Sequence, residues 1–311
     1  MRTGFTDVVI TTAHIESLRD FFSALGWTCR EELLSSDEVA FWSLDAPPSR
    51  AARMRLPSGS CTVTLIDVSP ETPLARPLTM PVTAPGGLFD INMRTCDSDW
   101  SRQFLLDYGW RVLVEPVAWQ FGDVLTKEGL FIQDDGVVLA VMERLHPPLD
   151  HVGFDRMSDI FNATQMVTSA EDTARFLAAL GFQVFIDHLG PLPGEGANVL
   201  QLEHVPEEEG AIRLLILHPY AGMDGSIELI ETLHTAQPRI DPPTAPARGL
   251  TALAIPHANI EALFARLLAS EWVDQIEQPL AERALWGREA VPSFSVRAPD
   301  GGRLDLYQCD K

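Results

Sequence analysis

The chain has 311 residues, of which 46% are hydrophobic and 22% charged, a composition typical of a soluble globular protein with about two domains. Its formal net charge of −21 argues against a nucleic-acid partner, because phosphate binding requires clustered Lys and Arg. No apolar run approaches the ~20 residues that span a bilayer, and the first residues lack an apolar signal core. We therefore expect a cytoplasmic protein with no membrane partner.

A short apolar strand followed by an amphipathic helix recurs four times along the chain. In the first three copies the helix ends on Gly and then an aromatic residue, where a left-handed residue commonly closes a helix. Further β-rich segments follow each helix, so each copy is predicted to be a βαβββ module of about 60 residues. The strand and helix-end segments are residues 7–10 with 21–27, 90–93 with 104–110, 162–165 with 176–182, and 251–254 with 264–272.

The later strands of each module follow from apolar runs and turn residues. We expect strands at 39–44 and 61–66 in the first module and at 199–202 and 212–217 in the third. In the second and fourth modules the last strand follows the turns at 134–136 and 299–302. Stretches rich in Pro or polar residues at 69–87, 144–159 and 218–249 are predicted to be linkers.

The sequence thus predicts an α+β fold of four βαβββ modules paired into two domains, each a pair of curved mixed sheets enclosing a cup with helices outside. Pairing is expected because one helix covers only one face of each four-stranded layer. Neighbouring modules should pair, giving one domain at 1–148 (modules about 1–68 and 87–145) and another at 156–311 (modules about 160–217 and 249–309). The four cysteines form no CxxC pair, which favours reduced structural thiols.

The module arrangement resembles the vicinal oxygen chelate superfamily, which includes glyoxalase I, bleomycin-resistance proteins and extradiol dioxygenases. The resemblance covers nearly the whole chain. It rests on the Phe-x4-Gly-aromatic helix ends and on Pro299-Asp300-Gly301-Gly302-Arg303-Leu304-Asp305-Leu306, which is similar to the family's Asp-Pro-Asp-Gly-Asn-x-Ile-Glu-Leu last strand. It implies the fold far more strongly than any chemistry.

For metal-dependent members, the resemblance implies His, Gln or Glu on a module's first strand and Glu or His on its last strand. No domain of this chain keeps a set of two His and one Glu, and catalytic Fe(II) or Zn(II) sites favour imidazole with carboxylate. We therefore predict no metal ligands and no cofactor. The mapped first-strand positions are Asp7, Asp90, Asn162 and Thr251, and the last-strand positions are about Thr64, Ala140, Leu215 and Asp305.

Strand alternation identifies polar residues that should face the cup of the first domain. In residues 89–94 the apolar Phe89, Ile91 and Met93 should pack against the helix, leaving Asp90, Asn92 and Arg94 to face the cup. The same alternation adds Asp7 from the first module. An Asp in an apolar enclosure can have a raised pKa, so Asp90 is a candidate general base. An internal pair of Asp90 and Arg94, or a solvated edge strand, is the alternative.

The cup of the second domain gains its polar residues in the same way. Asp305 and Tyr307 share one strand face and are candidate catalytic residues, as a proton acceptor and donor. The alternative is that Asp305 is a residual family carboxylate with satisfied hydrogen bonds. The predicted ligand-binding residues of this cup are Asn162, Thr164, Thr251 and Arg303.

Three functions remain open from the sequence. The favoured hypothesis is an enzyme of lyase or isomerase type that uses metal-independent acid–base chemistry on a small, largely apolar compound, aromatic or ketonic. The first alternative is a non-catalytic protein that binds a hydrophobic ligand or drug. The second is a metal-dependent dioxygenase with atypical ligands. The predicted partner is a small molecule, with a homodimer left open.

Overall fold

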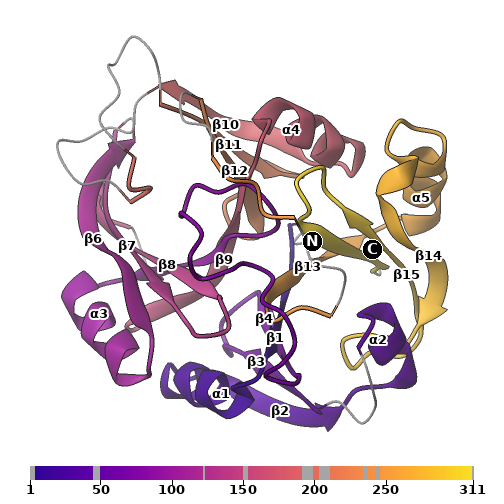
Figure 1. The fold of residues 1–311 in the computed structure, drawn as a ribbon, viewed down its shortest axis with the longest axis horizontal. Coiled ribbons are helices and arrows are strands. Elements are labelled where there is room, and N and C mark those ends of the chain that lie inside the picture. The colour runs from indigo at the N-terminus through magenta and orange to yellow at the C-terminus, as the bar shows by residue number, and fades with distance from the viewer. Residues whose placement is uncertain are drawn as a thin grey trace.

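The computed structural model describes residues 4–44, 50–121, 123–149, 153–190, 199–202, 211–233, 237–241 and 246–309. Within them the four predicted modules occur in chain order (Figure 1). The first module consists of β1 (Asp7–Thr12), α1 (Ile15–Ala24), β2 (Thr28–Leu33), α2 (Ser36–Phe41), β3 (Arg50–Arg55) and β4 (Thr62–Asp67). The second consists of β5 (Asp90–Thr95), α3 (Ser98–Asp107), β6 (Arg111–Phe121), β7 (Val124–Ile132) and β8 (Val138–His146).

The third and fourth modules repeat this order. The third consists of β9 (Met157–Met166), α4 (Ala170–Ala179), β10 (Gln183–Gly190), β11 (Ile212–His218) and β12 (Ser226–Thr232). The fourth consists of β13 (Gly249–His257), α5 (Ile260–Leu268), the 3-10 helix η1 (Val273–Gln275), β14 (Ile276–Arg283), β15 (Val291–Arg297) and β16 (Arg303–Gln308). The predicted α+β fold with four modules is confirmed.

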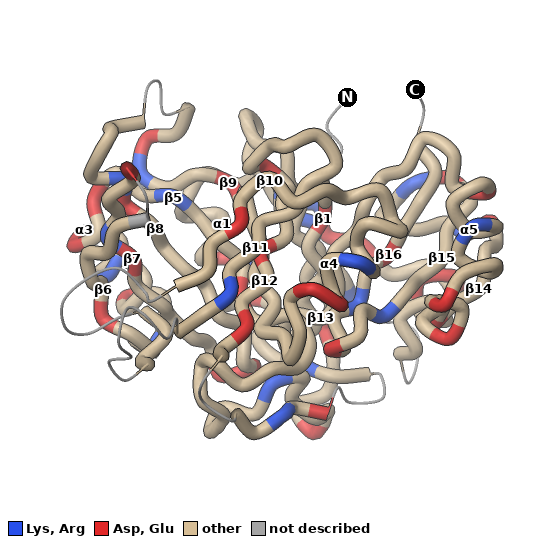
Figure 2. The backbone as a smooth tube through the Cα atoms, turned by 90° about the horizontal axis from the view of Figure 1, so that it is seen from above, with Lys and Arg blue, Asp and Glu red and all other residues tan. Residues whose placement is uncertain are grey.

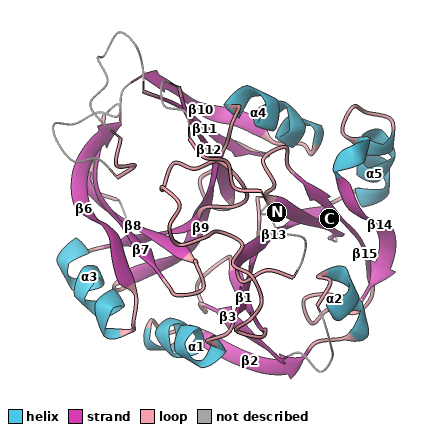
Figure 3. Cartoon of the chain, viewed as in Figure 1, coloured by secondary structure: helices cyan, strands magenta, loops and turns pink. Residues whose placement is uncertain are grey.

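The strands form two curved eight-stranded mixed sheets with α1, α3, α4 and α5 outside them and α2 on the inner face of one sheet (Figure 3). One sheet has the order β14-β15-β16-β13-β1-β4-β3-β2, and the other has the order β10-β11-β12-β9-β5-β8-β7-β6. In every module the first strand lies parallel to the last strand. The modules join through their first strands, which pair antiparallel as β1 with β13 and β5 with β9.

The pairing of modules differs from the prediction. The first module pairs with the fourth and the second with the third, so each sheet takes one module from each half of the chain. The short β8–β9 connection stays within one sheet, whereas the longer β4–β5 and β12–β13 linkers connect the two sheets and form a bridge between Leu74 and Arg248. The first strand of every module has an edge free to pair with another module, so the repeated sequence pattern does not determine which two modules pair.

Two segments also differ from the predicted elements. Residues 39–41 belong to α2 and residues 42–44 follow its end without forming a strand, because Ser35 and Glu38 form a capping box that starts a helix. Residues 199–202 form no strand, and the last strand of the third module is β12, inside the predicted linker. The predicted helix ends are confirmed at Gly26, Gly109 and Gly181, which have φ of +84°, +78° and +97°.

Two Asp-Gly turns hold the sheets together. Asp135, between β7 and β8, accepts a hydrogen bond from the Thr12 hydroxyl and forms a 2.7 Å ion pair with Arg248. Asp300, between β15 and β16, accepts hydrogen bonds from the backbone N–H (3.0 Å) and hydroxyl (2.7 Å) of Thr168. Thr12 is the last residue of β1, and Thr168 lies two residues after the end of β9. Each turn therefore binds the end of a first strand that belongs to the other sheet.

The main apolar core lies between the helices and the outer sheet faces, and it includes Phe21, Phe176 and Ile91. Acidic and basic residues are distributed along the whole chain, as Figure 2 shows, rather than forming one charged block. Among the described residues, no helix combines the length and apolar character that a bilayer crossing requires.

Candidate functional site

The inner face of the β5–β9 sheet encloses a cavity of about 170 Å³. Its walls are mainly apolar and come from both modules, including Phe89, Leu130, Met166, Leu214 and Ile216. The polar groups that reach it are Asp90, Asn92, Thr126, Glu128, Arg144, Asn162, Thr164 and Glu228, together with the Trp119 indole. Four predicted site residues, Asp90, Asn92, Asn162 and Thr164, thus meet in one cavity, although they were assigned to different cups.

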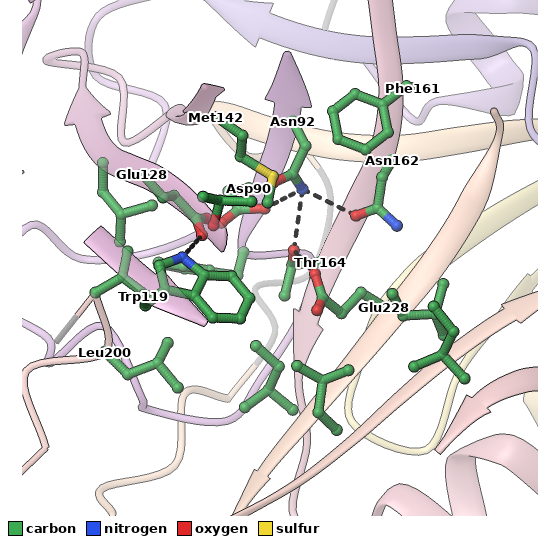
Figure 4. A pocket seen from close by; sticks show the side chains of 18 of the residues that line it. Asp90, Asn92, Trp119, Glu128, Met142, Phe161, Asn162, Thr164, Leu200 and Glu228 are labelled. Carbon is green, nitrogen blue, oxygen red and sulfur yellow. Dashed lines mark hydrogen bonds between the residues drawn. The ribbon is translucent and has the colours of Figure 1, made fainter. Parts of the chain in front are cut away.

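Asn92 is the centre of the hydrogen-bond network at the floor of this cavity (Figure 4). Its Nδ2 lies 3.0 Å from Asp90 Oδ1, 2.9 Å from Asn162 Oδ1 and 3.1 Å from Thr164 Oγ1. Strand pairing explains the cluster, because Asn92 lies opposite Asn162 and Asp90 lies opposite Thr164. Asn162 also donates to Ser226 Oγ at 2.7 Å. The network fixes the orientation of the Asp90 carboxyl group.

Two further carboxyl groups, Glu128 on β7 and Glu228 on β12, point into the same cavity (Figure 4). Glu128 accepts a hydrogen bond from Trp119 Nε1 at 2.7 Å, and Glu228 accepts one from Thr164 Oγ1 at 3.2 Å. Among the described residues, neither these two groups nor Asp90 forms an ion pair. The cavity therefore holds three carboxyl groups without a paired cation.

Burial strongly favours the protonated form of all three groups. Burial raises the pKa of Asp90 to about 7, although hydrogen bonds from Thr164 and Asn92 act in the opposite direction. Burial, then the charges of Glu228 and Asp90, raise the pKa of Glu128 to about 8. Burial, then the charge of Asp90, raise the pKa of Glu228 to about 8. At neutral pH the cavity can therefore contain both a carboxylate and carboxylic acids.

The sequence interpretation missed Glu128 and Glu228, and only Glu228 left a recognisable signal. Asp224-Gly225-Ser226-Ile227-Glu228-Leu229 contains an Asp-Gly turn followed by Ile-Glu-Leu, the same elements as the last-strand motif of the fourth module. The mapped last-strand position of the third module is accordingly Glu228 and not Leu215, which lies on β11. Glu128 lies in the polar stretch Thr126-Lys127-Glu128, which shows no apolar alternation typical of a strand.

Arg94 and Phe89 differ from the prediction in position. Phe89 lines the cavity instead of packing with Ile91 and Met93 against the helix, because it precedes the first residue of β5. The Arg94 guanidinium stacks over the Phe161 ring at 3.8 Å and lies 3.5 Å from Asp224. Arg94 is therefore beside the cavity and separated from it by Phe161, and it makes no internal pair with Asp90.

The remaining predicted residues lie in the β1–β13 sheet. Burial raises the pKa of Asp7, whose carboxylate accepts a 2.8 Å hydrogen bond from Thr6. The Tyr307 hydroxyl forms a 2.9 Å hydrogen bond with the same Thr6 hydroxyl. Burial raises the pKa of Tyr307 to about 12. Thr251 donates to the Val9 carbonyl at 3.0 Å. Asp7, Tyr307 and Thr251 therefore have hydrogen-bond partners within the protein.

Asp305 is a fully paired structural carboxylate. It accepts hydrogen bonds from Arg303 Nε at 2.8 Å and Trp42 Nε1 at 3.0 Å, so it is engaged away from the Tyr307 hydroxyl. Helix α2 and Trp42 pack with Trp286 and Tyr307 on the inner face of this sheet and fill its cup. A cavity of only about 60 Å³, lined by Thr251 and Arg303 among others, remains beside them.

The mapped positions do not fit the metal-ligand set that the resemblance implies. In the β5–β9 sheet they are Asp90, Ala140, Asn162 and Glu228, which include no imidazole, and the Asn162 oxygen already accepts a hydrogen bond from Asn92. In the β1–β13 sheet both Asp305 oxygens are occupied. The described residues contain no group of three or more His, Cys, Asp or Glu placed to hold a metal ion. We accordingly derive no step through a metal.

Comparison with known proteins establishes the fold. No family model matches the chain, and no curated protein matches its sequence. A mutant of glyoxalase I from Zea mays has a TM-score of 0.66 at 12% identity over 98% of this chain and 92% of that one. Glyoxalase I from Zea mays itself has a TM-score of 0.65 at 11% identity, with the same shares.

A putative dioxygenase from Bacillus subtilis has a TM-score of 0.58 at 14% identity and covers 99% of this chain and 86% of that one. At such identities the likeness concerns the fold alone. The chain has the vicinal oxygen chelate fold in its four-module form, as its helix ends and last-strand motif predicted.

Proposed function

We propose that the chain is an acid–base enzyme of isomerase or lyase type, whose substrate is a small, largely apolar carbonyl compound bound in the β5–β9 cavity. The observation that carries this proposal is the set of three carboxyl groups in one apolar cavity, with pKa values raised to about 7, 8 and 8 and with no paired cation among the described residues. Carboxyl groups held near their pKa at neutral pH can exchange protons with a substrate.

The arrangement assigns different roles to the three groups. Asp90 is oriented by Asn92 on the first strand of its module, so its carboxylate is the candidate base that removes a proton from the carbon next to the carbonyl. Protonated Glu128 or Glu228 would donate a hydrogen bond to the carbonyl oxygen as negative charge develops there. Return of the proton to another carbon gives an isomer, whereas departure of a leaving group gives a lyase reaction.

Proton exchange between small ketones and D2O tests the proposal directly. Wild-type protein should accelerate loss of the α-proton NMR signals of cyclohexanone or acetophenone, with a maximum rate near pH 7–8 set by the coupled groups. Asp90→Asn should reduce the rate by about 10²–10⁴-fold. Asp7→Asn, in the filled cup of the other sheet, is the matched control and should leave it unchanged.

The alternative of a protein that only binds its ligand predicts a different result. It predicts that such compounds raise the melting temperature of the protein without any exchange above the rate in buffer. That combination, or equal exchange by wild type and Asp90→Asn, would refute the acid–base proposal.

A further inference from the structure

One end of the β5–β9 cavity has the opposite electrostatic character from its carboxyl groups. Arg144 on β8 lies on the same strand face as Met142, and both line the cavity. Arg144 is half-buried, yet it makes no ion pair and no hydrogen bond with the described part of the chain. An unpaired guanidinium is unexpected in a chain with 44 acidic and 23 basic residues.

A second polar group next to Arg144 also lacks a partner. Thr126 lies directly opposite Arg144 in the β7–β8 pairing and lines the cavity. Its side chain is only 4% exposed, and its hydroxyl is buried without a hydrogen-bond partner among the described residues. A buried hydroxyl without a partner destabilises the folded protein, so its retention beside a free guanidinium indicates a group supplied from outside.

Arg94 adds positive charge at this end. It lies opposite Met142 in the β5–β8 pairing, and the row of Met142 is two residues along the strands from the Thr126–Arg144 row. Its guanidinium is fixed over Phe161, and Phe161 itself lines the cavity. Burial lowers the pKa of Arg94, and the charge of Arg144 makes a smaller contribution in the same direction. An anion bound by Arg144 in the cavity would also experience the positive charge of Arg94 from behind the Phe161 ring.

The geometry specifies the kind of anion. Arg144 and Thr126 lie opposite each other in the β7–β8 pairing and both line the cavity, and a guanidinium together with a hydroxyl provides donors that suit a carboxylate. A dianion such as a phosphate ester is disfavoured, because Asp90, Glu128 and Glu228 share the same cavity. Thr126 and Glu128 are two residues apart on β7, so about 7 Å separates their positions along the strand, which is the length of about four or five covalent bonds.

We propose that the natural substrate is a small monocarboxylate whose carboxylate group is bound by Arg144 and Thr126, while its apolar body and carbonyl group lie toward Glu128 and Asp90. This inference rests on the proposed function for the identity of the reacting end, but the carboxylate subsite itself requires no turnover. Arg144 and Thr126 are thereby specificity residues, and the acid–base groups act at the other end of the same ligand.

The subsite is tested with two probes of equal shape, 4-phenylbutanoate and 4-phenylbutanamide, by titration calorimetry at pH 7. The wild-type protein should bind the acid at least about tenfold more tightly than the amide, and added salt should reduce this preference. Arg144→Met should remove the preference, Arg144→Lys should retain part of it, and Thr126→Val should reduce it a few fold. Arg111→Met, which changes an exposed arginine on β6, is the control and should retain the full preference.

The outcomes separate this inference from the proposed function. If Arg144→Met keeps its melting temperature and still prefers the acid, or if wild type binds the two probes equally or binds neither at millimolar concentration, the carboxylate subsite is refuted. Asp90→Asn should lose ketone exchange and keep the preference for the acid.

Discussion

Replacement of Glu128 by Gln should make the protein more stable at alkaline pH. Burial and the nearby charges of Glu228 and Asp90 raise the pKa of Glu128 from 4.5 to about 8. An acid whose pKa is raised by folding contributes stability that is fully present below pH 4.5 and is lost as the pH rises through about 8. Glu128→Gln removes this titration but keeps an oxygen that can accept the hydrogen bond from Trp119 Nε1.

The size of the effect follows from the shift. A change of 3.5 pKa units, taken as the difference between 8 and 4.5, corresponds to about 5 kcal/mol at 1.36 kcal/mol per unit, of which about 4 kcal/mol is lost by pH 8. This value is an upper bound, because Asp90 and Glu228 titrate in the same range and their charges supply part of the shift. The difference in unfolding free energy between variant and wild type should therefore grow by up to about 1.4 kcal/mol per pH unit between pH 5 and 8.

Urea denaturation at several pH values measures this difference. The unfolding free energies of wild type and Glu128→Gln should be similar at pH 5 and should diverge toward pH 8, with the variant more stable and the dependence on urea unchanged. Glu115→Gln on β6 is the control, because Glu115 is exposed and its ion pair with Arg102 lowers its pKa. Parallel pH profiles for wild type and Glu128→Gln would show that Glu128 is not held protonated by its surroundings.

Two further predictions concern the fold. Fragments 1–148 and 150–311 should each lack native-like circular dichroism when expressed alone, because the cut separates β1 from β13 and β5 from β9; a folded fragment would contradict this topology. Asp135→Ala should lower the unfolding free energy by about 1–3 kcal/mol, because it leaves the Thr12 hydroxyl and Arg248 without their acceptor. The neighbouring Asp134→Ala, at an exposed position, should change it by less than about 0.5 kcal/mol, and equal losses would argue against a role for the Asp135 turn.

The sequence predicted those parts of the fold that local chemistry determines. Strand β5 starts at the predicted Asp90, and Gly26, Gly109 and Gly181 close the predicted helices, because apolar periodicity and left-handed glycines are properties of short segments. Helix α2 was mistaken for a strand because a short apolar run fits either element, although Ser35 and Glu38 already provided a helix start. The partner of each module depends on which strand edges meet, and periodicity contains no information on that.

The candidate site was likewise predictable only where local sequence patterns determine it. Strand alternation correctly indicated that Asp90, Asn92, Asn162 and Thr164 face a sheet interior, but their meeting in one cavity follows from the antiparallel register of β5 with β9. Because the predicted module pairing was wrong, these four residues were assigned to two different cups. Strand β12 was not predicted, and Glu228 was missed with it, because Pro238, Pro242, Pro243 and Pro246 led to residues 218–249 being assigned as a linker.

The two sheets differ in the cavity that their described residues enclose, about 170 Å³ in the β5–β9 sheet and about 60 Å³ in the β1–β13 sheet. Both sheets place buried acids on their inner faces, but in the β1–β13 sheet α2 brings Trp42 against Asp305, and Arg303 completes its pairing. In the β5–β9 sheet the described residues place no helix between β6 and β7 of the second module, and its acids face an open cavity. Helix α2 therefore makes one cup part of the core, while the other cup contains carboxyl groups and a guanidinium that form no ion pair within the described part of the chain.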